Sequence, residues 1–310
     1  MNRTISDFLL ELYSNASECL PNELRLRTLK SLQSALPFDF AVWGGGSADG
    51  RLVTDLTVLD QTTAVLEEWE AIASADAFCD LTLQRLGATA RFDDVPKYRK
   101  SMAYNEHWRK FDATHMMATI SAEGSDGYVS FVGLCAKSRQ TAFSDKEKAF
   151  KQTLMPHLSQ ALRMNREIWT GRAALKHEAV ALIDHDGWIL SSQGPFELFA
   201  RDEWSSVGRI PAEAMRKIRS GQSWHGQTVT VRPSPFEDKH FIHIRHQPTR
   251  SVLSPRERQV AELFASGLTN KEVARTLGTA PSTVRNQLER IYDKLEIGSK
   301  SELVALFNQY

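Results

Sequence analysis

The sequence predicts an α+β fold class, in which an N-terminal α/β region precedes an all-α region of four helices. Short apolar runs bounded by turn residues recur between residues 38 and 137 and again between 179 and 246, as expected of strands. Apolar residues spaced three and four apart dominate residues 143–169 and 254–307, as expected of helices. The 42% hydrophobic and 25% charged content is that of an ordinary globular protein.

The elements of the first region follow from its apolar runs and breakers. Pro21 separates two helices at the start of the chain. The run "WGGGSADG" (43–50) is predicted to be a turn after a strand, since it lacks the Lys-Ser/Thr pair of a phosphate loop. Ser144 and Glu147 form an S-x-x-E capping box at the start of a long helix. In order, we expect two helices in 1–36, strands over 38–43 and 51–59, a helix over 62–78, a hairpin over 115–137 and a helix over 143–169.

A second unit is predicted from residue 177 onward. Its first hairpin turns at Asp186-Gly187, a strong turn signal between apolar runs. A short helix over 211–221 and a second hairpin over 227–246 follow. Residues 248–253, "PTRSVL", are short, polar and without periodicity, which favours a linker.

From residue 254 the local signals agree with one another. Ser254 with Glu257, Thr269 with Glu272, and Ser299 with Glu302 each form a capping box that precedes helical periodicity. Glycines at 267 and 278 follow the first two of these helices, as expected of helix C-termini. The sequence therefore predicts four helices in residues 254–310.

The third of these helices, residues 281–295, carries the pattern with the clearest functional meaning. Its apolar residues from Val284 to Leu295 recur at spacings of 4, 3 and 4, which predicts one buried stripe. Small polar and basic side chains, among them Arg285 and Asn286, share the opposite face. Arginine can pair with guanine and asparagine with adenine, so a helix pair with this outer face indicates a DNA-reading helix-turn-helix. By itself such a face also fits a solvated helix in an ordinary bundle.

The segment 253–307 resembles the DNA-binding domain of the LuxR/FixJ (GerE-type) family. The resemblance rests on "LSPRE" (253–257), Gly267, "TNKEVA" (269–274), "LG" (277–278), "TVRN" (283–286), "I-x-x-KL" (291–295) and "SELV" (301–304). It implies a four-helix module whose third helix enters the major groove and whose fourth helix commonly dimerises. Gln287 stands where the family usually has His, which affects sequence preference more than binding.

The resemblance implies a transcription regulator that binds double-stranded DNA as a homodimer and contacts RNA polymerase if it is an activator. Arg285, Asn286 and Gln287 would face the bases. The expected phosphate contacts are Thr269, Lys271, Ser282, Thr283, Arg290 and Lys294, with Asn270 at the turn.

Two common input domains of this family are not supported by residues 1–170. The βα alternation of a phosphate-receiving domain is missing. Trp69 is followed by Ala73 and Thr82 where an acyl-homoserine-lactone receptor has Tyr and Asp. The helix-flanked sheet instead resembles GAF sensory domains, and the "VALIDHDGWILSS" hairpin is similar to the start of a PAS domain. We therefore expect a GAF-like sensory domain over 1–172, a reduced PAS-like domain over 173–247, a linker over 248–253 and the helix-turn-helix domain over 254–310.

Aromatic residues are plentiful between Phe38 and Phe131 and suggest a pocket for a small apolar or aromatic ligand. A packed core would leave the same trace, and so would an interaction or dimerisation platform without a pocket. Both alternatives stay open. The candidate ligand-binding residues are Trp43, Trp69, Phe78, Tyr104, Trp108 and Phe131.

Histidines and cysteines suggest no catalytic or metal site. Along a strand His243 would point away from His240 and His246, so we predict a surface hairpin rather than a metal centre. Cys79 and Cys135 could sense oxidants but more often such residues pack as small hydrophobes. We expect no catalytic residues, no cofactor, no metal and no enzymatic activity.

The charge and hydropathy of the sequence limit which functional classes remain. The formal net charge is zero, and residues 251–310 contain 8 basic and 7 acidic residues. Binding to nucleic acid must therefore depend on geometry rather than on bulk charge. No apolar run approaches the roughly 20 residues that span a bilayer, and no secretory signal is visible. We expect a cytoplasmic protein without a membrane partner.

Overall fold

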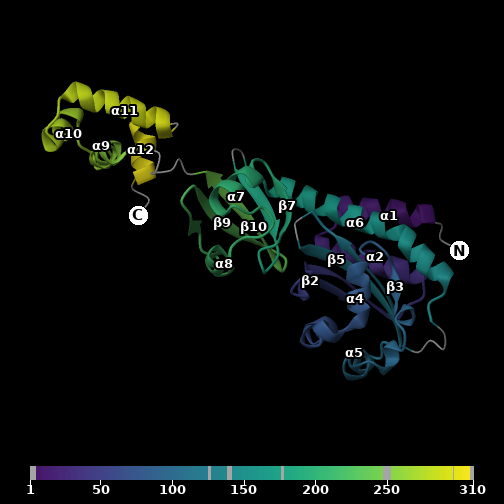
Figure 1. The fold of residues 1–310 in the computed structure, drawn as a ribbon. Coiled ribbons are helices and arrows are strands. Elements are labelled where there is room, and N and C mark those ends of the chain that lie inside the picture. Colours follow the sequence, from purple (N-terminus) through teal and green to yellow (C-terminus); the bar gives the residue numbers. More distant parts are fainter. Residues whose placement is uncertain are drawn as a thin grey trace. The chain divides into compact units, whose positions relative to one another are not determined.

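The computed structural model describes residues 5–124, 127–137, 142–175, 178–246, 253–295 and 297–307. The chain divides into two compact units, one of residues 1–224 with 231–244 and one of residues 225–230 with 245–310 (Figure 1). It has the expected α+β composition, with sheet-containing regions first and a helical region last. The predicted linker 248–253 lies outside the described residues except for Leu253.

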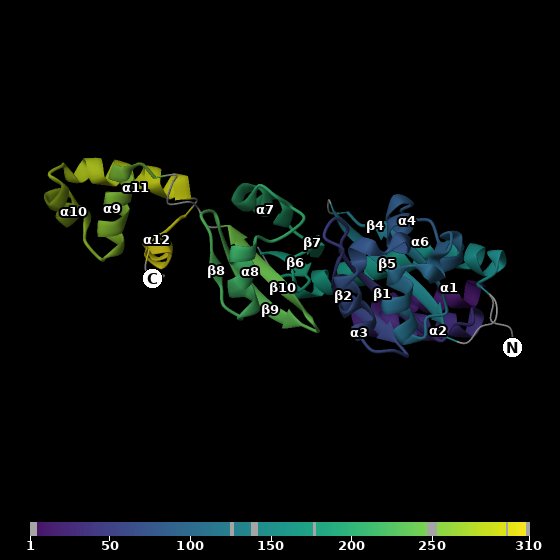
Figure 2. The ribbon, with the colours of Figure 1, turned by 60° about the horizontal axis from the view of Figure 1, so that its bottom comes forward.

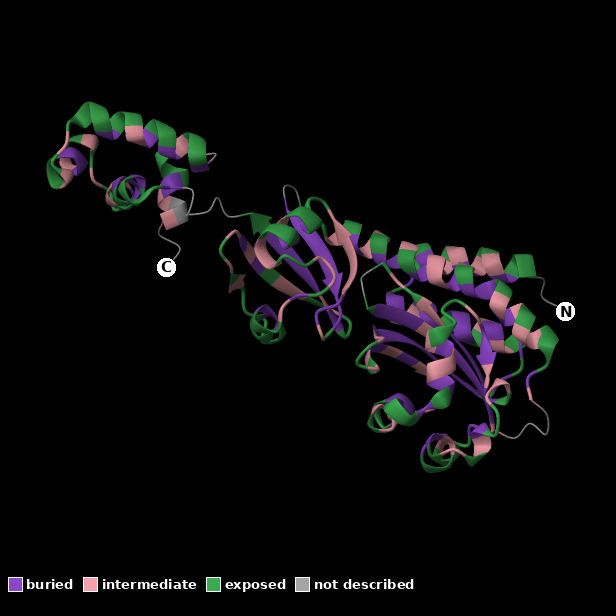
Figure 3. Cartoon of the chain, viewed as in Figure 1, coloured by how far each residue is buried: buried purple, intermediate pink, exposed green. Residues whose placement is uncertain are grey.

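The first sheet has five strands in the order β2-β1-β5-β4-β3. Neighbouring strands in it are antiparallel. The strands are β1 (Phe40–Ser47), β2 (Leu52–Leu59), β3 (Ala90–Arg91), β4 (His115–Ala122) and β5 (Tyr128–Ala136). The central strand β5 and its neighbour β1 are buried along almost their whole length, because helices cover both faces of the sheet (Figure 3).

Three helices cover one face of this sheet: α1 (Ile5–Glu18), α2 (Pro21–Ala35) and α6 (Asp145–Ala173) (Figure 1). They enclose an apolar core that includes Leu12, Leu29, Trp43 and Leu158. Short helices cover the other face: α3 (Ala64–Glu67), α4 (Ala77–Gln84) and α5 (Met102–Glu106). The core on that side is largely aromatic. The sequence prediction of a helix-flanked sheet is confirmed.

The second sheet also has five strands, in the order β7-β6-β10-β9-β8. Its strands are β6 (Ala179–Ile183), β7 (Ile189–Gln193), β8 (Trp224–His225), β9 (Val229–Phe236) and β10 (Lys239–His246), and its helices are α7 (Phe196–Trp204) and α8 (Ala212–Arg219) (Figure 2). Val180, Leu182 and Phe241 pack against Trp169 and Ala173 at the end of α6. One long helix thus contributes to the cores of both sheets.

The C-terminal helices are α9 (Pro255–Ala265), α10 (Asn270–Leu277), α11 (Pro281–Leu295) and α12 (Lys300–Phe307). They share one small apolar core. Both capping boxes predicted at the starts of α9 and α10 are present, with the serine or threonine oxygen accepting the N3 amide and the glutamate accepting the N-cap amide. Gly278 ends α10 with φ of 64°, a left-handed conformation that favours glycine.

The turn predicted over residues 43–50 is confirmed only at its end, residues 48–50, and is wrong for Gly44–Gly46. All three glycines lie within β1, opposite β2 and β5, and the turn comes after Ser47. A Cβ atom at Gly46 would lie 1.9 Å from the carbonyl oxygen of Leu52, so only glycine allows the two strands to approach so closely at the bulge. These glycines allow the backbones of neighbouring strands to pack closely, which the glycine content of the run does not reveal.

The predicted helix over 62–78 is also wrong in its middle. The structure has α3, two 3₁₀ turns at Trp69–Ala71 and Ala73–Ala75, and then α4. The chain is bent around Asp76, whose carboxylate caps α4 by accepting from the amides of Phe78 and Cys79 and also accepts from the Trp69 indole. Tertiary hydrogen bonding to a buried carboxylate has overridden helical periodicity.

Two features of the second sheet region differ from expectation. Helix α7 was not predicted, because Gly194-Pro195 marks a turn and the helix that follows is only nine residues long. His243 is not on the surface: it is 7% exposed and lies 3.4 Å from Glu178, between its Nδ1 and the Oε2 of the glutamate. Its neighbours Ile242 and Ile244 are buried too, so β10 is covered on both faces there.

Among the described residues, no helix is long and apolar enough to cross a membrane. Within the same residues, no group of three or more His, Cys, Asp or Glu side chains is arranged to hold a metal ion.

Candidate functional site

Helices α9, α10 and α11 form a compact platform. Val273 and Ala274 of α10 and Val284 and Ile291 of α11 are buried in the shared core, as the spacing predicted. The turn between α10 and α11 is closed by the Thr279 amide, which donates to the Ala274 carbonyl at 2.9 Å. Arg256 of α9 donates to the carbonyl at the end of α10 at 2.7 Å. The second helix of the pair is therefore held at a fixed angle to the first.

The face of α11 opposite the core is exposed. Ser282, Arg285, Asn286 and Glu289 all lie on it, and Gln287 is half-buried. Arg285 forms no ion pair with any residue that the structure describes, so its guanidinium can bind bidentately to a base or a phosphate. This combination of a packed stripe and an exposed, donor-rich stripe is the geometry that a DNA-reading helix requires.

The predicted phosphate-contacting residues lie at the start of α10 and along α11. Thr269, Lys271, Thr283 and Arg290 are exposed. The Thr269 hydroxyl is used by its own capping box, donating to Glu272 at 2.7 Å. Amide groups in the first turn of α10 remain suited to an anion, because a helix N-terminus carries positive potential.

Lys294 differs from the other predicted contacts because its ammonium has an internal partner. Its Nζ donates to Oε2 of Glu257 at 2.7 Å, which ties α11 to the capping box of α9. Hydrogen bonds from Lys294 and from the Ser254 amide lower the pKa of Glu257 to about 2. The structure thus gives Lys294 a packing role between helices.

Two amide side chains at the predicted interface carry buried oxygens without a partner among the described residues: Oδ1 of Asn270 and Oε1 of Gln287. Buried polar atoms are nearly always paired in folded proteins. Both residues were predicted to face DNA, Asn270 at the turn and Gln287 at the bases.

The structure does not bring the six predicted ligand-binding aromatics together. Trp43 belongs to the core under α1, α2 and α6, whereas the other five belong to the core on the opposite face of the sheet. There, Phe78 and Trp108 are buried, and Tyr104 and Phe131 are partly buried. Side chains along β1 alternate between the two faces of the sheet, so Trp43 lies on the opposite face from Phe40 and Val42. This alternation can be read from the sequence.

Asp76 organises the aromatic core and was not predicted from the sequence. Besides capping α4, its carboxylate accepts hydrogen bonds from Trp69 Nε1 at 2.8 Å, Tyr98 Oη at 2.8 Å and Trp108 Nε1 at 3.1 Å. The indole donors of Trp69 and Trp108, two of the three tryptophans predicted to line a pocket, are therefore used within the protein. An Asp just before the run "AFCDLTLQ" is an N-cap signal that could have been recognised.

A cavity of about 40 Å³ adjoins this core and is lined by Trp69, Cys79 and Phe131 among others. This volume holds a few waters at most, whereas sites for drug-sized ligands occupy roughly 300–1,000 Å³. Burial, reinforced by Asp76, raises the pKa of the Cys79 thiol to about 12, and burial also raises that of Cys135. Both thiols are thus held in the unreactive, protonated form.

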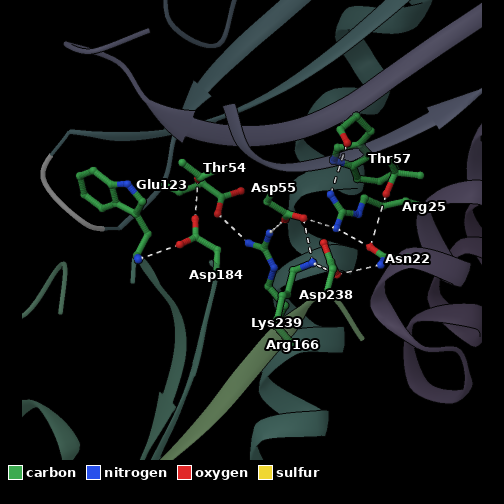
Figure 4. A network of polar contacts seen from close by, with 12 residues as sticks. Asn22, Arg25, Thr54, Asp55, Thr57, Glu123, Arg166, Asp184, Asp238 and Lys239 are labelled. Atoms are coloured by element: carbon green, nitrogen blue, oxygen red, sulfur yellow. Dashed lines mark hydrogen bonds and ion pairs between the residues drawn. The ribbon is translucent and has the colours of Figure 1, made fainter. Parts of the chain in front are cut away.

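A buried network of charges joins the two sheets and was not predicted (Figure 4). Its centre is Asp55 of β2, which is 2% exposed. Asp55 Oδ1 lies 2.7 Å from Arg25 of α2 and 2.9 Å from Lys239 of β10, and Oδ2 lies 3.0 Å from Arg166 of α6. Burial alone would raise the pKa of Asp55, but the three cations lower it well below its ordinary value. Four elements distant in sequence thus meet at one carboxylate.

A second carboxyl group, Asp184 at the end of β6, lies close to this network. Its Oδ2 accepts from the Thr54 hydroxyl at 2.5 Å (Figure 4). Its Oδ1 accepts from the amides of Asp186 and Trp188. No ion pair is formed by Asp184 within the described part of the chain, and burial raises its pKa to about 6. Between about pH 4 and pH 6, the folded state therefore keeps a proton on Asp184 that the unfolded state has already released.

The raised pKa of Asp184 predicts a specific pH dependence of stability. Its folded pKa exceeds the unfolded value, so its unfavourable contribution is absent below pH ~4 and grows as the pH rises to ~6. Asp184→Asn should remove this penalty and stabilise the protein above pH 6 by on the order of 2 kcal/mol, with little effect near pH 4. Urea unfolding at several pH values measures the difference. Asp202→Asn, at an exposed position on α7, is the control; equal pH profiles for Asp184→Asn and the wild type would contradict the prediction.

Comparison with known proteins identifies the C-terminal helices. A family model described as "Bacterial regulatory proteins, luxR family" matches residues 251–307. The putative HTH-type transcriptional regulator in the exeN 3' region of Aeromonas salmonicida is 47% identical over 55 residues, 18% of this chain and 28% of that protein. The tetrathionate response regulatory protein TtrR of Salmonella typhimurium is 37% identical over 174 residues, 49% of this chain and 84% of that protein.

Among solved structures, Escherichia coli SdiA aligns over 98% of this chain and 96% of its own, with 11% identity and a TM-score of 0.36. The chain spans less than a third of the Aeromonas relative but most of TtrR. Helices α9 to α12 are a luxR-type helix-turn-helix domain. The chain belongs to the luxR family of bacterial regulatory proteins.

Proposed function

We propose that this protein is a sequence-specific, DNA-binding transcription regulator whose helix α11 reads the major groove. The observation that carries the proposal is the exposed face of α11, where Arg285 and Asn286 stand on a helix fixed by a buried stripe and by capped neighbours. The match of residues 251–307 to the luxR family supports the same role. Nothing in this proposal gives the chain an enzymatic role.

The contacts divide between bases and backbone. Arg285, Asn286 and Gln287 would read base edges, since their side chains offer the donors and acceptors that guanine and adenine recognise. Lys271 and Arg290 would bind phosphates. The remaining backbone contacts would come from Thr269, Asn270, Ser282 and Thr283, with Lys294 close by on α11. Because the region from residue 251 on is nearly neutral, these few side chains carry most of the attraction.

We further propose that the protein acts as a homodimer in the cytoplasm, with the GAF-like region of residues 1–172 and the PAS-like region of residues 173–247 as its input. A dimer would place two reading helices on successive half-sites of DNA. An input signal can change DNA binding only by favouring one state of the protein over another. If the protein activates transcription, RNA polymerase is a further partner.

A second candidate for residues 1–172 is an interaction or dimerisation platform without a ligand pocket among its aromatics. The filled aromatic core favours it: the cavity beside Trp69 and Phe131 is only about 40 Å³, and Asp76 already accepts the indole hydrogen bonds of Trp69 and Trp108. A small apolar ligand at those six aromatic residues would require the core to open.

The proposed function is tested by measuring binding of the full-length protein to DNA over a range of salt concentrations. We expect tighter binding to a fragment from upstream of its own gene than to random DNA of equal length, and a logarithmic affinity that falls linearly with the logarithm of salt concentration. Equal affinity for both fragments, together with no enrichment of any sequence from a random DNA pool, would contradict the proposal.

A further inference from the structure

A groove of about 1190 Å³ in the first unit runs along one edge of the second sheet. Strand β7 is an edge strand of that sheet and lies beside α6 (Figure 1). Five consecutive residues, Trp188–Ser192, line the groove. Successive side chains of a strand point to opposite faces, so a cavity over one face of a sheet would be lined by alternate residues. The groove therefore follows the edge of β7.

The chain itself covers only the start of this edge. The Ile189 amide donates to the Gly208 carbonyl at 3.1 Å, and the Ile210 amide donates to the Gly187 carbonyl at 2.9 Å. These two bonds are the beginning of a sixth strand, antiparallel to β7. The side of β7 that faces away from β6 can thus pair with a further strand.

Beyond Ile189 the two paired segments separate. Among the described residues, the backbone of Leu190–Gln193 pairs only with β6, and Ser205–Val207 makes no backbone hydrogen bond to β7. Leu190–Ser192 and Ser205–Val207 both line the groove, which lies between them. An edge strand directs part of its amides and carbonyls away from the sheet, and such open groups pair readily with an extended chain.

The charged side chains along the groove balance one another. Arg166 pairs with Glu123 at 2.9 Å, and Arg209 pairs with Asp186 at 3.6 Å. Two basic and two acidic side chains remain, all of them exposed: Arg163, Arg201, Glu167 and Glu197. Since neither sign of charge is in excess, the groove suits an occupant without net charge that is recognised through its backbone.

We propose that this groove binds an extended peptide segment of a partner protein, which joins the second sheet as a strand beside β7. The open residues, Leu190–Gln193, span about 14 Å at ~3.4 Å per residue, so the added strand has about four or five residues. The groove is larger than the roughly 300–1,000 Å³ of sites for drug-sized ligands, so a peptide of this length fits. Backbone hydrogen bonds supply the affinity of such strand addition, and alternate side chains supply its specificity.

A peptide segment suits the groove better than β7 of a second copy of the chain. Residues of α6 and α7 form walls of the groove on either side of the edge. In a second copy, β7 is flanked by the same two helices, which would collide with these walls before the strands could pair. Peptide binding here does not rest on the proposed reading of DNA by α11.

Titration of the full-length protein with a blocked, uncharged pentapeptide of alternating threonine and valine tests the proposal. Because the affinity comes from the backbone, this simple sequence should bind saturably. Hydrogen exchange of the β7 amides should slow by about tenfold at saturation, and exchange in β2, an edge strand outside the groove, should not change.

Two further peptides carry N-methyl groups on alternate amides, at odd positions in one and at even positions in the other. Only every second amide of an added strand faces the edge, so one peptide should bind about tenfold more weakly and the other nearly as well as the parent. No saturable binding of the parent, equal loss in both methylated peptides, or protection of β2 instead of β7 would each overturn the proposal.

Ser206→Trp should abolish binding, because a large side chain at this exposed lining residue would fill the groove. Ser223→Trp is the matched control, since Ser223 is exposed and does not line the groove. Thermal unfolding confirms that both variants are folded. Unchanged binding by Ser206→Trp would contradict the proposed site. Because DNA is absent from the titration, a protein that binds its DNA but not the peptide would fail this inference alone.

Discussion

Replacing Asp55 with Ala should destabilise the first unit by roughly 3–5 kcal/mol, because three buried cations would lose their common partner. Asp55 has 2% exposure and pairs with Arg25, Arg166 and Lys239, whose charged groups all lie within 3.0 Å of it. Without the carboxylate, these cations would remain buried near one another. Arg166 would keep Glu123 as an acidic partner, and Lys239 would keep Asp238. An unpaired buried charge costs far more than the pair contributes.

The experiment compares urea unfolding of the wild type, Asp55→Ala and Asp49→Ala. Asp49 is exposed in the turn between β1 and β2, close to Asp55 in sequence, and its replacement should change stability very little. Asp55→Asn should be intermediate, since it keeps the shape and one acceptor but not the charge. A loss of less than ~1 kcal/mol in Asp55→Ala would show that water, not the carboxylate, solvates the three cations.

Replacing Ile291 with Ala should destabilise the C-terminal helices by about 2–5 kcal/mol and abolish DNA binding at about 37 °C. Ile291 of α11 is fully buried in the core that helices α9 to α12 share, which has few large side chains. A domain with a small core is only marginally stable, so losing one large buried side chain can unfold it. Because the two units have separate cores, unfolding of the first unit should be unaffected.

The matched control is Glu289→Ala, two residues earlier on the exposed face of α11. Alanine is the best helix former, so this variant should retain its helix and its stability. Circular dichroism and proteolysis follow the two units separately. Full stability and DNA binding by Ile291→Ala would mean that the core of α9 to α12 does not set the position of α11.

Local signals in the sequence were sufficient where an element is stabilised by its own residues. The capping boxes at Ser144, Ser254 and Thr269, and the apolar stripe of α11, are short-range features, and all of them are present in the structure. The exposed face of α11 followed directly from that stripe. For this reason the exposure of Ser282, Arg285, Asn286 and Glu289 on α11 could be predicted from the sequence. The ion pair between Lys294 and Glu257 could not.

Features that depend on distant partners were not predictable in the same way. Asp55 is one acidic residue in an alternating strand, and only the fold brings it to Arg25, Arg166 and Lys239. Asp76 interrupts a helical pattern because three aromatic donors converge on it in space. Gly46 belongs to a strand because a carbonyl of β2 lies where its Cβ would be. Composition and periodicity do not show which residues distant in the sequence come into contact.

The central claim, direct base reading by α11, is tested most directly by comparing wild type with Arg285→Ala on the fragment upstream of its own gene and on random DNA. Losing one bidentate base contact should reduce the preference for the specific fragment by ~1–3 kcal/mol, roughly 5- to 150-fold, and leave salt-dependent binding to random DNA nearly unchanged. Arg285 has no ion pair within the described residues, so the fold should not change. An undiminished preference in Arg285→Ala would contradict the assignment of α11 as the reading helix.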